Sequence, residues 1–254
     1  VLDSHAHLDL MDGDVDEALA AARSVGIDTV VQVGVDLASS RWSAEVASRY
    51  DAVHAAVAIH PNEAGRGAAD DEALREIEAL AALSQVKAVG ETGLDFFRTV
   101  TPEGHRQQEE AFRAHIAIAK RTGTALVIHD RDAHDDVIRV LLDEGAPDRV
   151  VFHCYSGDAA MARTCADHGW FMSFAGPVTF TANDGLREAV AAAPAELLLV
   201  ETDAPFLTPM PYRGRPNAPY LVPLTVRSMA AARGADLDEL CGSIAANGRR
   251  AFAL

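Results

Sequence analysis

Short apolar runs that alternate with longer helical segments constrain the fold of this chain most. Eight of these runs are rich in β-branched residues and predict strands. The predicted strands span residues 1–5, 28–34, 53–59, 86–91, 124–129, 149–154, 169–174 and 197–203. Segments with helical spacing lie between them, at 14–25, 38–49, 70–83, 103–122, 133–144, 157–168 and 183–193, and two more follow the last strand.

Eight strand-then-helix units, with strands that are apolar on both faces, favour an α/β fold of the (β/α)8 TIM-type barrel class. A doubly wound parallel sheet is the alternative. No repeat, low-complexity tract or linker divides the chain, so we expect one domain over residues 1–254. Thr101, Pro102 and Gly123 are suited to the cap, the first position and the stop of the longest helix.

The composition is typical of a protein with a large core. Hydrophobic residues make up 49% of 254 residues, and no apolar run approaches the roughly 18 residues of a membrane helix. We therefore expect a soluble protein with no membrane partner. The first residues lack the basic and apolar regions of a secretory signal, which predicts a cytoplasmic location. Cys154, Cys165 and Cys241 show no Cys-x-x-Cys spacing, which argues against a disulfide framework or a cysteine zinc site.

The chain is acidic, with a formal net charge of −16 at pH 7. A field of this sign repels a polyanion at long range and argues against nonspecific coating of nucleic acid. A small nucleic-acid site is still compatible with it, because bound divalent cations and a few arginines reverse the sign locally. The sequence leaves the oligomeric state open, and a monomer is compatible with it.

Residues of metal-ligating type stand at the C-terminal ends of the predicted strands, where a barrel carries its functional groups. Two histidines one residue apart in a strand can direct both imidazoles to one point. The ligand-type residues are His5, His7, Glu91, His129, His153 and Asp203. Such nitrogen and oxygen donors suit zinc, manganese or cobalt better than a purely oxygen-seeking ion. One ion cannot use all six and stay open to substrate, whereas two ions that share a carboxylate can.

Each of these residues also has an ordinary alternative. A lone histidine at a strand end is more often hydrogen-bonded or exposed than a ligand, and Glu91 or Asp203 could cap a helix. Six ligand-type residues at matching ends of five strands, however, form a pattern that packing does not need. His54, His105 and His115 lie inside predicted elements, and we expect them to be structural.

Three arginines are candidates for contact with a phosphate group. Arg131 lies two residues beyond His129, so the two side chains share a face if the strand continues. Arg213 and Arg215 lie in a proline-rich segment, residues 204–223, which holds six of the eleven prolines. Prolines at this density predict an extended loop, which would follow the eighth strand and cover the catalytic face of a barrel. For each arginine, a surface ion pair is the alternative.

Motifs along the whole chain resemble those of one enzyme family. They are LDSHAHLD (2–9), IHPNE (59–63), VGETGLDFF (89–97), VIHDRDA (127–133), VFHCYSG (151–157), LLVETDAPFLTP (198–209), RGRPNAP (213–219) and NGRRAF (247–252). In this order they resemble the TatD family of metal-dependent deoxyribonucleases. The resemblance implies a distorted barrel of the amidohydrolase-like superfamily, a site for two divalent ions (Zn, Mn, Mg or Co), and hydrolysis of DNA phosphodiesters.

The resemblance also implies a ligand set. One ion would take His5, His7, Glu91 and Asp203, and the other would take Glu91, His129 and His153, so that Glu91 bridges them. Relatives in the wider superfamily often place a modified lysine at the end of the fourth strand, where this chain has Glu91. In the segment RGRPNAP, Pro216 and Ala218 replace a basic residue and a glutamate that many members of the family carry.

We therefore expect a two-metal deoxyribonuclease, with the 3′–5′ exonuclease type favoured. Two ions about 4 Å apart would activate a water molecule and stabilise charge on the leaving oxygen. Asp203 would act as general base, and His60 would orient the substrate or accept a hydrogen bond. An amide or ester hydrolase such as a D-aminoacyl-tRNA deacylase would use the same site. A noncatalytic metal-binding or scaffold protein would lack a ligand, and none is missing.

Overall fold

The computed structural model describes residues 1–254 and contains one parallel sheet. Its eight strands follow one another in sequence order, from β1 to β8. They are β1 (Leu2–Ala6), β2 (Thr29–Val33), β3 (Val53–Val57), β4 (Val86–Asp95), β5 (Ala125–Arg131), β6 (Val150–Phe152), β7 (Phe171–Phe174) and β8 (Leu198–Val200). A doubly wound sheet reverses its strand order at a switch point, so the sequential order excludes that alternative. The prediction of a TIM-type (β/α)8 barrel is confirmed.

Helices follow the strands as the spacing predicts. They are α1 (Val15–Ser24), α2 (Leu37–Arg49), α3 (Pro61–Ala64), α4 (Asp71–Ala81), α5 (Pro102–Thr122), α6 (His134–Glu144), α7 (Ala159–Asp167), α8 (Asp184–Ala192), α9 (Val222–Arg233) and α10 (Leu237–Phe252). The short α3 was not expected. It begins because His60 Nδ1 accepts the N–H of Asn62 and Pro61 takes the first helical position.

By internal contacts the residues group into two compact units. Unit 1 comprises Val1–Val31 and His153–Leu254, and unit 2 comprises Gln32–Phe152. The division falls within β2 and directly after β6. The expectation of one domain over residues 1–254 stays a prediction.

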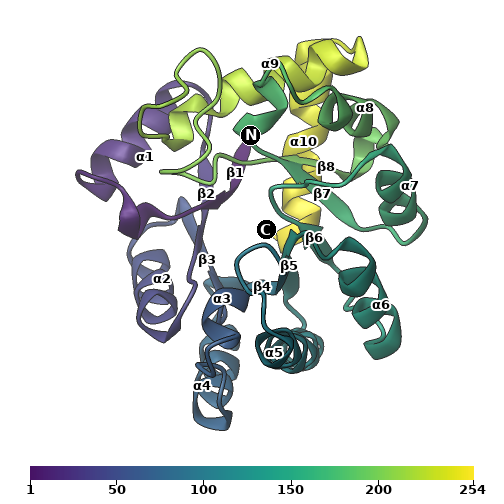
Figure 1. Ribbon diagram of the computed structural model, residues 1–254. Helices are drawn as coiled ribbons and strands as arrows, with labels where there is room; N and C mark the ends of the chain where they lie inside the picture. Colours follow the sequence, from purple (N-terminus) through teal and green to yellow (C-terminus); the bar gives the residue numbers. More distant parts are fainter. The chain divides into compact units, whose positions relative to one another are not determined.

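Unit 2 carries β3 to β6 with parallel pairing between neighbours. Its helices α2, α4, α5 and α6 surround the strands in Figure 1, and α5 packs on β4 and β5. The core is formed by large side chains with almost no exposure, among them Ile77, Phe112, Ile116, Leu126 and Ile128. Burial of each such side chain contributes about 2 kcal/mol, so the strand ends of unit 2 rest on a rigid support.

The longest helix of unit 2 has the boundaries that its sequence predicts. The Thr101 hydroxyl accepts the N–H of Gly104 at 3.1 Å, and Pro102 occupies the first turn. Gly123 ends the helix in the left-handed conformation, with φ of 66°. A residue with a side chain is disfavoured in that conformation, so the glycine fixes where β5 can begin.

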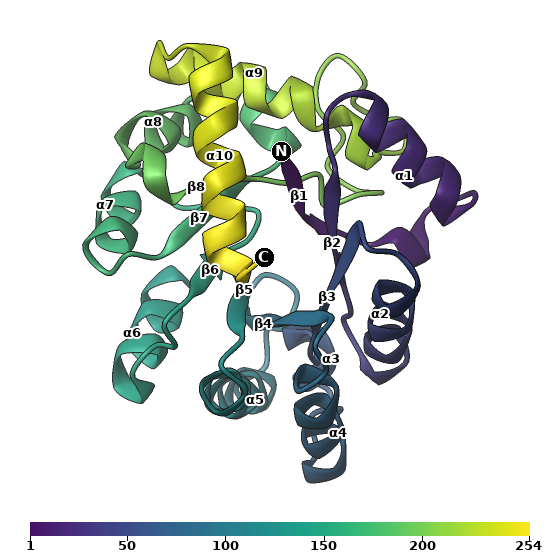
Figure 2. The ribbon, with the colours of Figure 1, turned by 180° about the vertical axis from the view of Figure 1, so that it is seen from behind.

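Unit 1 carries β1, β7 and β8 with α1 and α7 to α10. Figure 2 shows α10 lying along this unit, and it contacts both β1 and β8. Gly248 permits the contact, because a Cβ atom there would lie 2.2 Å from Leu2 Cδ2. The Asn247 side chain donates hydrogen bonds to the carbonyl oxygens of Ala195 and Leu198, both at 2.8 Å. These bonds hold the start of β8 against the helix.

Several strands end within a few residues of the predicted positions, and two of these differences, in β4 and β8, affect the candidate site. β4 continues to Asp95 instead of stopping at Glu91, with a shift of register between Val89 and Thr92. Gly93 makes this continuation possible, because a Cβ atom there would lie 2.1 Å from the carbonyl oxygen of His129. β8 is shorter than predicted and ends at Val200, and the backbone adopts the left-handed conformation at Asp203, where φ is +56°.

Candidate metal centre

The first cluster lies in unit 1 and consists of His5, His7 and Asp203. The two ring nitrogens Nε2 of His5 and His7 are 3.3 Å apart. Asp203 Oδ1 lies 3.8 Å from His5 Nε2 and 3.4 Å from His7 Nε2. The side chains of His5 and His7 are buried, and Asp203 is half-buried. Two imidazoles and a carboxylate thus converge on one point, as the spacing of the two histidines predicts.

Backbone contacts position the carboxylate of the first cluster. The N–H of Asp203 donates to the carbonyl oxygen of His5 at 2.9 Å, and the N–H of His7 donates to Ala204 at 2.8 Å. Ala6 and Ala204 also form a parallel bridge. Residues that are far apart in the sequence are therefore fixed beside each other. Burial raises the pKa of Asp203, but the hydrogen bond from His7 and the nearby histidine charges lower it below its ordinary value.

Asp3 bonds His5 and the residue that precedes Asp203 in the first cluster. Its carboxylate accepts the N–H of Thr202 at 2.9 Å, the hydroxyl of Thr202 at 2.5 Å and the N–H of His5 at 3.3 Å. Complete burial raises the pKa of Asp3 to about 7, against the lowering effect of these hydrogen bonds. Asp3 thus holds the backbone on both sides of the cluster and does not touch an imidazole in these bonds.

His153 adds a third imidazole to the first cluster. Its ring stacks on that of His5 with centroids 3.9 Å apart and 18° between the planes. Glu201 Oε1 lies 3.1 Å from His153 Nδ1 and also accepts the N–H of Cys154 at 2.7 Å. A carboxylate that holds one nitrogen of an imidazole presents the other nitrogen to a metal. Sequence reasoning missed Glu201, because it placed this residue inside the eighth strand.

The second cluster lies in unit 2 and consists of His60, Glu91 and His129. Glu91 Oε1 is 2.6 Å from His129 Nδ1 and 3.4 Å from His60 Nε2. The two imidazole rings lie 4.6 Å apart at 66°. Glu91 is buried and the two histidines are half-buried. This cluster has the same donor composition as the first, with two imidazoles and one carboxylate.

Asp95 belongs to the second cluster as a partner of His129. Its Oδ2 atom lies 3.2 Å from His129 Nε2, and its Oδ1 atom accepts the N–H of Arg98 at 2.7 Å. Burial raises the pKa of Asp95, but these hydrogen bonds and the charges of His129 and Arg131 outweigh it and lower the pKa to about 2. Glu91, Gly93 and Asp95 alternate along one strand, so a longer predicted strand would have placed Asp95 on the face of Glu91.

Three other histidines, His54, His105 and His115, lie in helices or strands, and two of them bond backbone groups. His115 is fully buried in α5, where its Nε2 accepts the N–H of Ile59 at 3.1 Å and its Nδ1 donates to Ala111 at 2.7 Å. Burial lowers its pKa to about 4. His105 bonds the carbonyl oxygen of Thr99, and His54 lies within β3. His115 therefore braces the backbone that leads to His60.

The three arginines proposed for substrate contact each cover an aromatic ring. The guanidinium carbon of Arg131 lies 4.0 Å from the centre of the Phe97 ring, and that of Arg213 lies 4.4 Å from Phe180. Arg215 lies 5.9 Å from Tyr212. A guanidinium group on an aromatic face keeps its donors available to a phosphate. Their role as substrate contacts stays a prediction.

The residues of both clusters fit divalent metal ions. In each cluster the donor atoms lie within 4.8 Å of one another, from residues of mixed imidazole and carboxylate chemistry. Such donor sets suit zinc, manganese and cobalt. The chain therefore combines the strand order of a TIM-type barrel with clusters of residues that are suited to binding metal ions.

Comparison with known proteins agrees with this class. The family model of TatD-related DNases matches residues 2–253. An uncharacterized metal-dependent hydrolase TatD of Mycobacterium tuberculosis is 47% identical and covers 100% of this chain and 98% of that protein. A 3′-5′ ssDNA/RNA exonuclease TatD of Klebsiella pneumoniae is 36% identical over 95% of this chain and 92% of its own length. The crystal structure of YjjV, a TatD homologue of Escherichia coli K12, matches with a TM-score of 0.92 at 25% identity, covering 100% and 98% of the two chains.

The protein belongs to the TatD-related DNase family, as its motifs indicate. It is a metal-dependent hydrolase with the TIM-type barrel fold. None of its helices combines the length and the apolar character that crossing a membrane requires. Its location in the cell and its oligomeric state stay predictions.

Proposed function

We propose that this hydrolase cleaves phosphodiester bonds of single-stranded DNA from the 3′ end, with a divalent ion at each cluster. The observation that carries the proposal is the convergence of imidazole and carboxylate groups in each unit, with His129 and Glu91 as the donors in the second cluster and His60 beside them. The substrate class is supported by relatives that bear the name 3′-5′ ssDNA/RNA exonuclease, one of which is 36% identical to this chain.

In the first cluster, His5 and His7 would bind an ion through Nε2 and Asp203 through Oδ1, since these three atoms face one another. In the second cluster, Asp95 holds Nε2 of His129, so His129 would bind through Nδ1, beside Glu91 Oε1. Bound divalent ions lower the pKa of a water molecule and stabilise negative charge on phosphate oxygens.

The bridging role of Glu91 and the assignment of His153 to the second ion stay predictions from the family resemblance. Metal content tests the bridge directly. Glu91→Ala should lose both ions, whereas a ligand of one ion would lose only that ion. A protein that retains both ions in this variant would contradict the bridge.

The chain's own groups have distinct tasks in this reaction. Asp203 is kept ionised by its lowered pKa, so its carboxylate can accept a proton from the attacking water. His60 Nδ1 already accepts the N–H of Asn62, so the neutral ring carries its proton on Nε2. His60 therefore donates toward Glu91 or toward a substrate oxygen. Arg131 is the last residue of β5 and lies two residues beyond His129. Its guanidinium group would bind a phosphate group of the substrate.

The proposal is tested with oligonucleotides labelled at either end. Metal-loaded protein should shorten a 5′-labelled single strand one nucleotide at a time, and should release the label of a 3′-labelled strand at once. Duplex DNA and an RNA strand of the same sequence define the substrate range. The same preparation should leave a D-aminoacyl-tRNA intact. Release of the amino acid, with the DNA unchanged, would instead support the deacylase alternative.

A further inference from the structure

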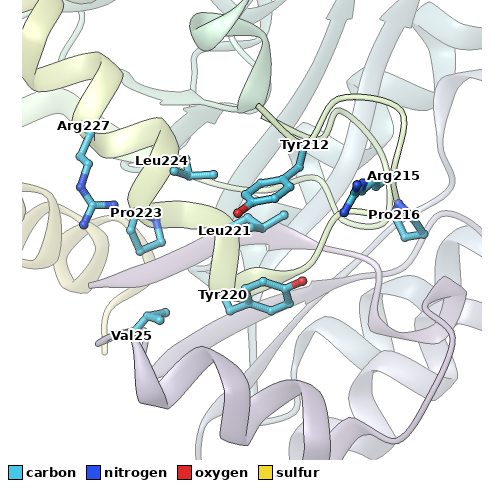
Figure 3. A pocket seen from close by; sticks show the side chains of 9 residues that line it. All are labelled: Val25, Tyr212, Arg215, Pro216, Tyr220, Leu221, Pro223, Leu224 and Arg227. Atoms are coloured by element: carbon cyan, nitrogen blue, oxygen red, sulfur yellow. The ribbon is translucent and has the colours of Figure 1, made fainter. Parts of the chain in front are cut away.

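A surface groove in unit 1 lies outside the two clusters and has the chemistry of a ligand site. Its volume is about 830 Å³, within the range of cavities that hold small ligands. We call it the tyrosine groove. It is lined by Val25, Tyr212, Arg215, Pro216, Tyr220, Leu221, Pro223, Leu224 and Arg227. Figure 3 shows the Tyr212 ring close to Leu221, with Arg227 and Arg215 toward opposite sides of the labelled set.

The charge of the tyrosine groove is opposite to that of the whole chain. Arg215 and Arg227 are its only charged lining residues, and both are exposed. Neither forms an ion pair, whereas Arg113 and Arg139 each bind two or more carboxylates in unit 2. In a chain with a net charge of −16, two unpaired guanidinium groups in one groove select an anion.

The rest of the groove is aromatic and apolar. Tyr212 and Tyr220 are 43% and 44% exposed, so a large part of each side chain is available to a ligand. Leu221, Pro223 and Leu224 add apolar surface to the lining. Exposed aromatic rings beside cationic groups bind nucleotides by stacking on bases and pairing with phosphates. No carboxylate lines the groove, so it lacks the negatively charged group that would favour a metal ion or an amine over an anion.

The groove is continuous along the chain with the first cluster. Tyr212, Arg215 and Pro216 belong to the proline-rich segment that begins directly after Asp203. Within that segment, the Asn217 side chain donates to the carbonyl oxygens of Thr202 at 2.8 Å and Phe206 at 2.6 Å. The same segment therefore forms one wall of the groove and fixes the backbone beside Asp203.

We propose that the tyrosine groove binds nucleotides of the single-stranded substrate that lie away from the end being cleaved. This inference rests on the proposed function and adds a second contact region to it. Tyr212 and Tyr220 would stack on bases, and Arg215 and Arg227 would bind phosphates. A volume of about 830 Å³ accommodates about two nucleotides, so affinity should rise with strand length beyond the reacting nucleotide.

The test is fluorescence anisotropy with metal-loaded, full-length protein and a labelled oligothymidylate of about twelve nucleotides. Phosphorothioate linkages keep the strand intact during the measurement. Tyr220→Ala should weaken binding by about fivefold or more, and Tyr220→Phe, which keeps the ring, should bind like the wild type. Arg227→Ala should weaken binding and reduce the slope of log K against log salt by about 0.7.

Arg163→Ala is the matched control, because Arg163 is an exposed arginine of α7 in the same unit without an ion pair. It should bind like the wild type. Equal affinities of the wild type, Tyr220→Ala and Arg227→Ala would overturn the inference. Thymidine monophosphate that competes as strongly per molecule as the long strand would also overturn it, since the groove would then hold a free nucleotide.

Hydrolysis of an ordinary phosphodiester strand, measured separately, distinguishes the two proposals. If the wild type hydrolyses the strand and the groove variants bind it like the wild type, the proposed function is retained and the groove is rejected as a contact region. Binding that depends on Arg227 and Tyr220, without hydrolysis under any divalent ion, would reject the proposed function and retain the groove as a nucleic-acid site.

Discussion

The two clusters share one donor composition but satisfy their ring nitrogens in different ways. In the first cluster, His5 and His7 direct Nε2 toward each other at 3.3 Å. Asp203 Oδ1 lies 3.4 Å from His7 Nε2, so these ring nitrogens and the carboxylate oxygen all point toward one place. In the second cluster, His129 lies between the carboxylates of Glu91 and Asp95. The first cluster thus directs its ligand atoms at one another, whereas in the second cluster an additional carboxylate, Asp95, holds the second ring nitrogen of His129.

Asp203→Asn should have the largest effect on the reaction, because it removes the carboxylate of the first cluster. Loss of a general base typically lowers the rate by about 10²- to 10⁴-fold. The measurement is the initial rate on a single-stranded DNA substrate, with metal content determined in parallel. Asp167→Asn, at an exposed position of unit 1, should keep the wild-type rate. Near-normal hydrolysis by Asp203→Asn with its metal retained would eliminate the base role.

Glu201→Ala should have the next largest effect. Without the carboxylate, His153 loses the hydrogen bond at Nδ1 that fixes its orientation. Removal of such a partner typically costs about 10- to 100-fold in metal affinity or activity. Metal affinity can be measured by competition with a chelating dye. Glu201→Gln keeps an acceptor for Cys154 N–H and should lie between the wild type and the alanine variant. An unchanged affinity in both variants would show that His153 does not serve a metal.

Asp95→Asn tests the second cluster in the same way and should have a smaller effect, of about tenfold. His129 keeps its contact with Glu91 in this variant, and the asparagine oxygen can still accept the N–H of Arg98. A chelator titration of both variants compares the two supporting carboxylates directly. If Asp95→Asn proves more damaging than Glu201→Ala, His129 depends more on its supporting carboxylate than His153 does.

Substitution of His115 should have the smallest effect on activity, but it should change how the free energy of unfolding depends on pH. Its pKa falls from the ordinary value near 6.5 to about 4 because the folded protein buries it. Between these pH values the unfolded chain binds a proton that the folded protein does not, so stability falls as pH decreases from about 6.5 to 4. The loss amounts to up to about 3 kcal/mol.

The pH effect of His115 can be isolated with His115→Gln, which keeps an acceptor for Ile59 N–H and a donor for Ala111. Urea unfolding at several pH values should show a flatter stability profile between pH 6.5 and 4 in the variant. Parallel profiles of the two proteins would contradict the assignment of this slope to His115.

The sequence predicts most of the barrel, because each strand is a short apolar run and each helix has its own periodicity and caps. It also predicts His5, His7 and Asp203 as neighbours. Side chains two residues apart in a strand share a face, and the first and last strands of a closed barrel lie next to each other. It does not predict the continuation of β4 to Asp95, which depends on the close approach of Gly93 to His129. Glu201 was missed for a related reason, because β8 ends earlier than its apolar run suggests.

Metal content and hydrolysis, measured together on a pair of variants, test the central claim most directly. The wild type should bind about two divalent ions per chain and should lose all hydrolysis when they are removed. His7→Ala and His129→Ala should each retain about one ion and should each be inactive, because each removes a ligand from a different cluster. Wild-type hydrolysis of DNA after complete metal removal, or full activity of either variant, would contradict the account.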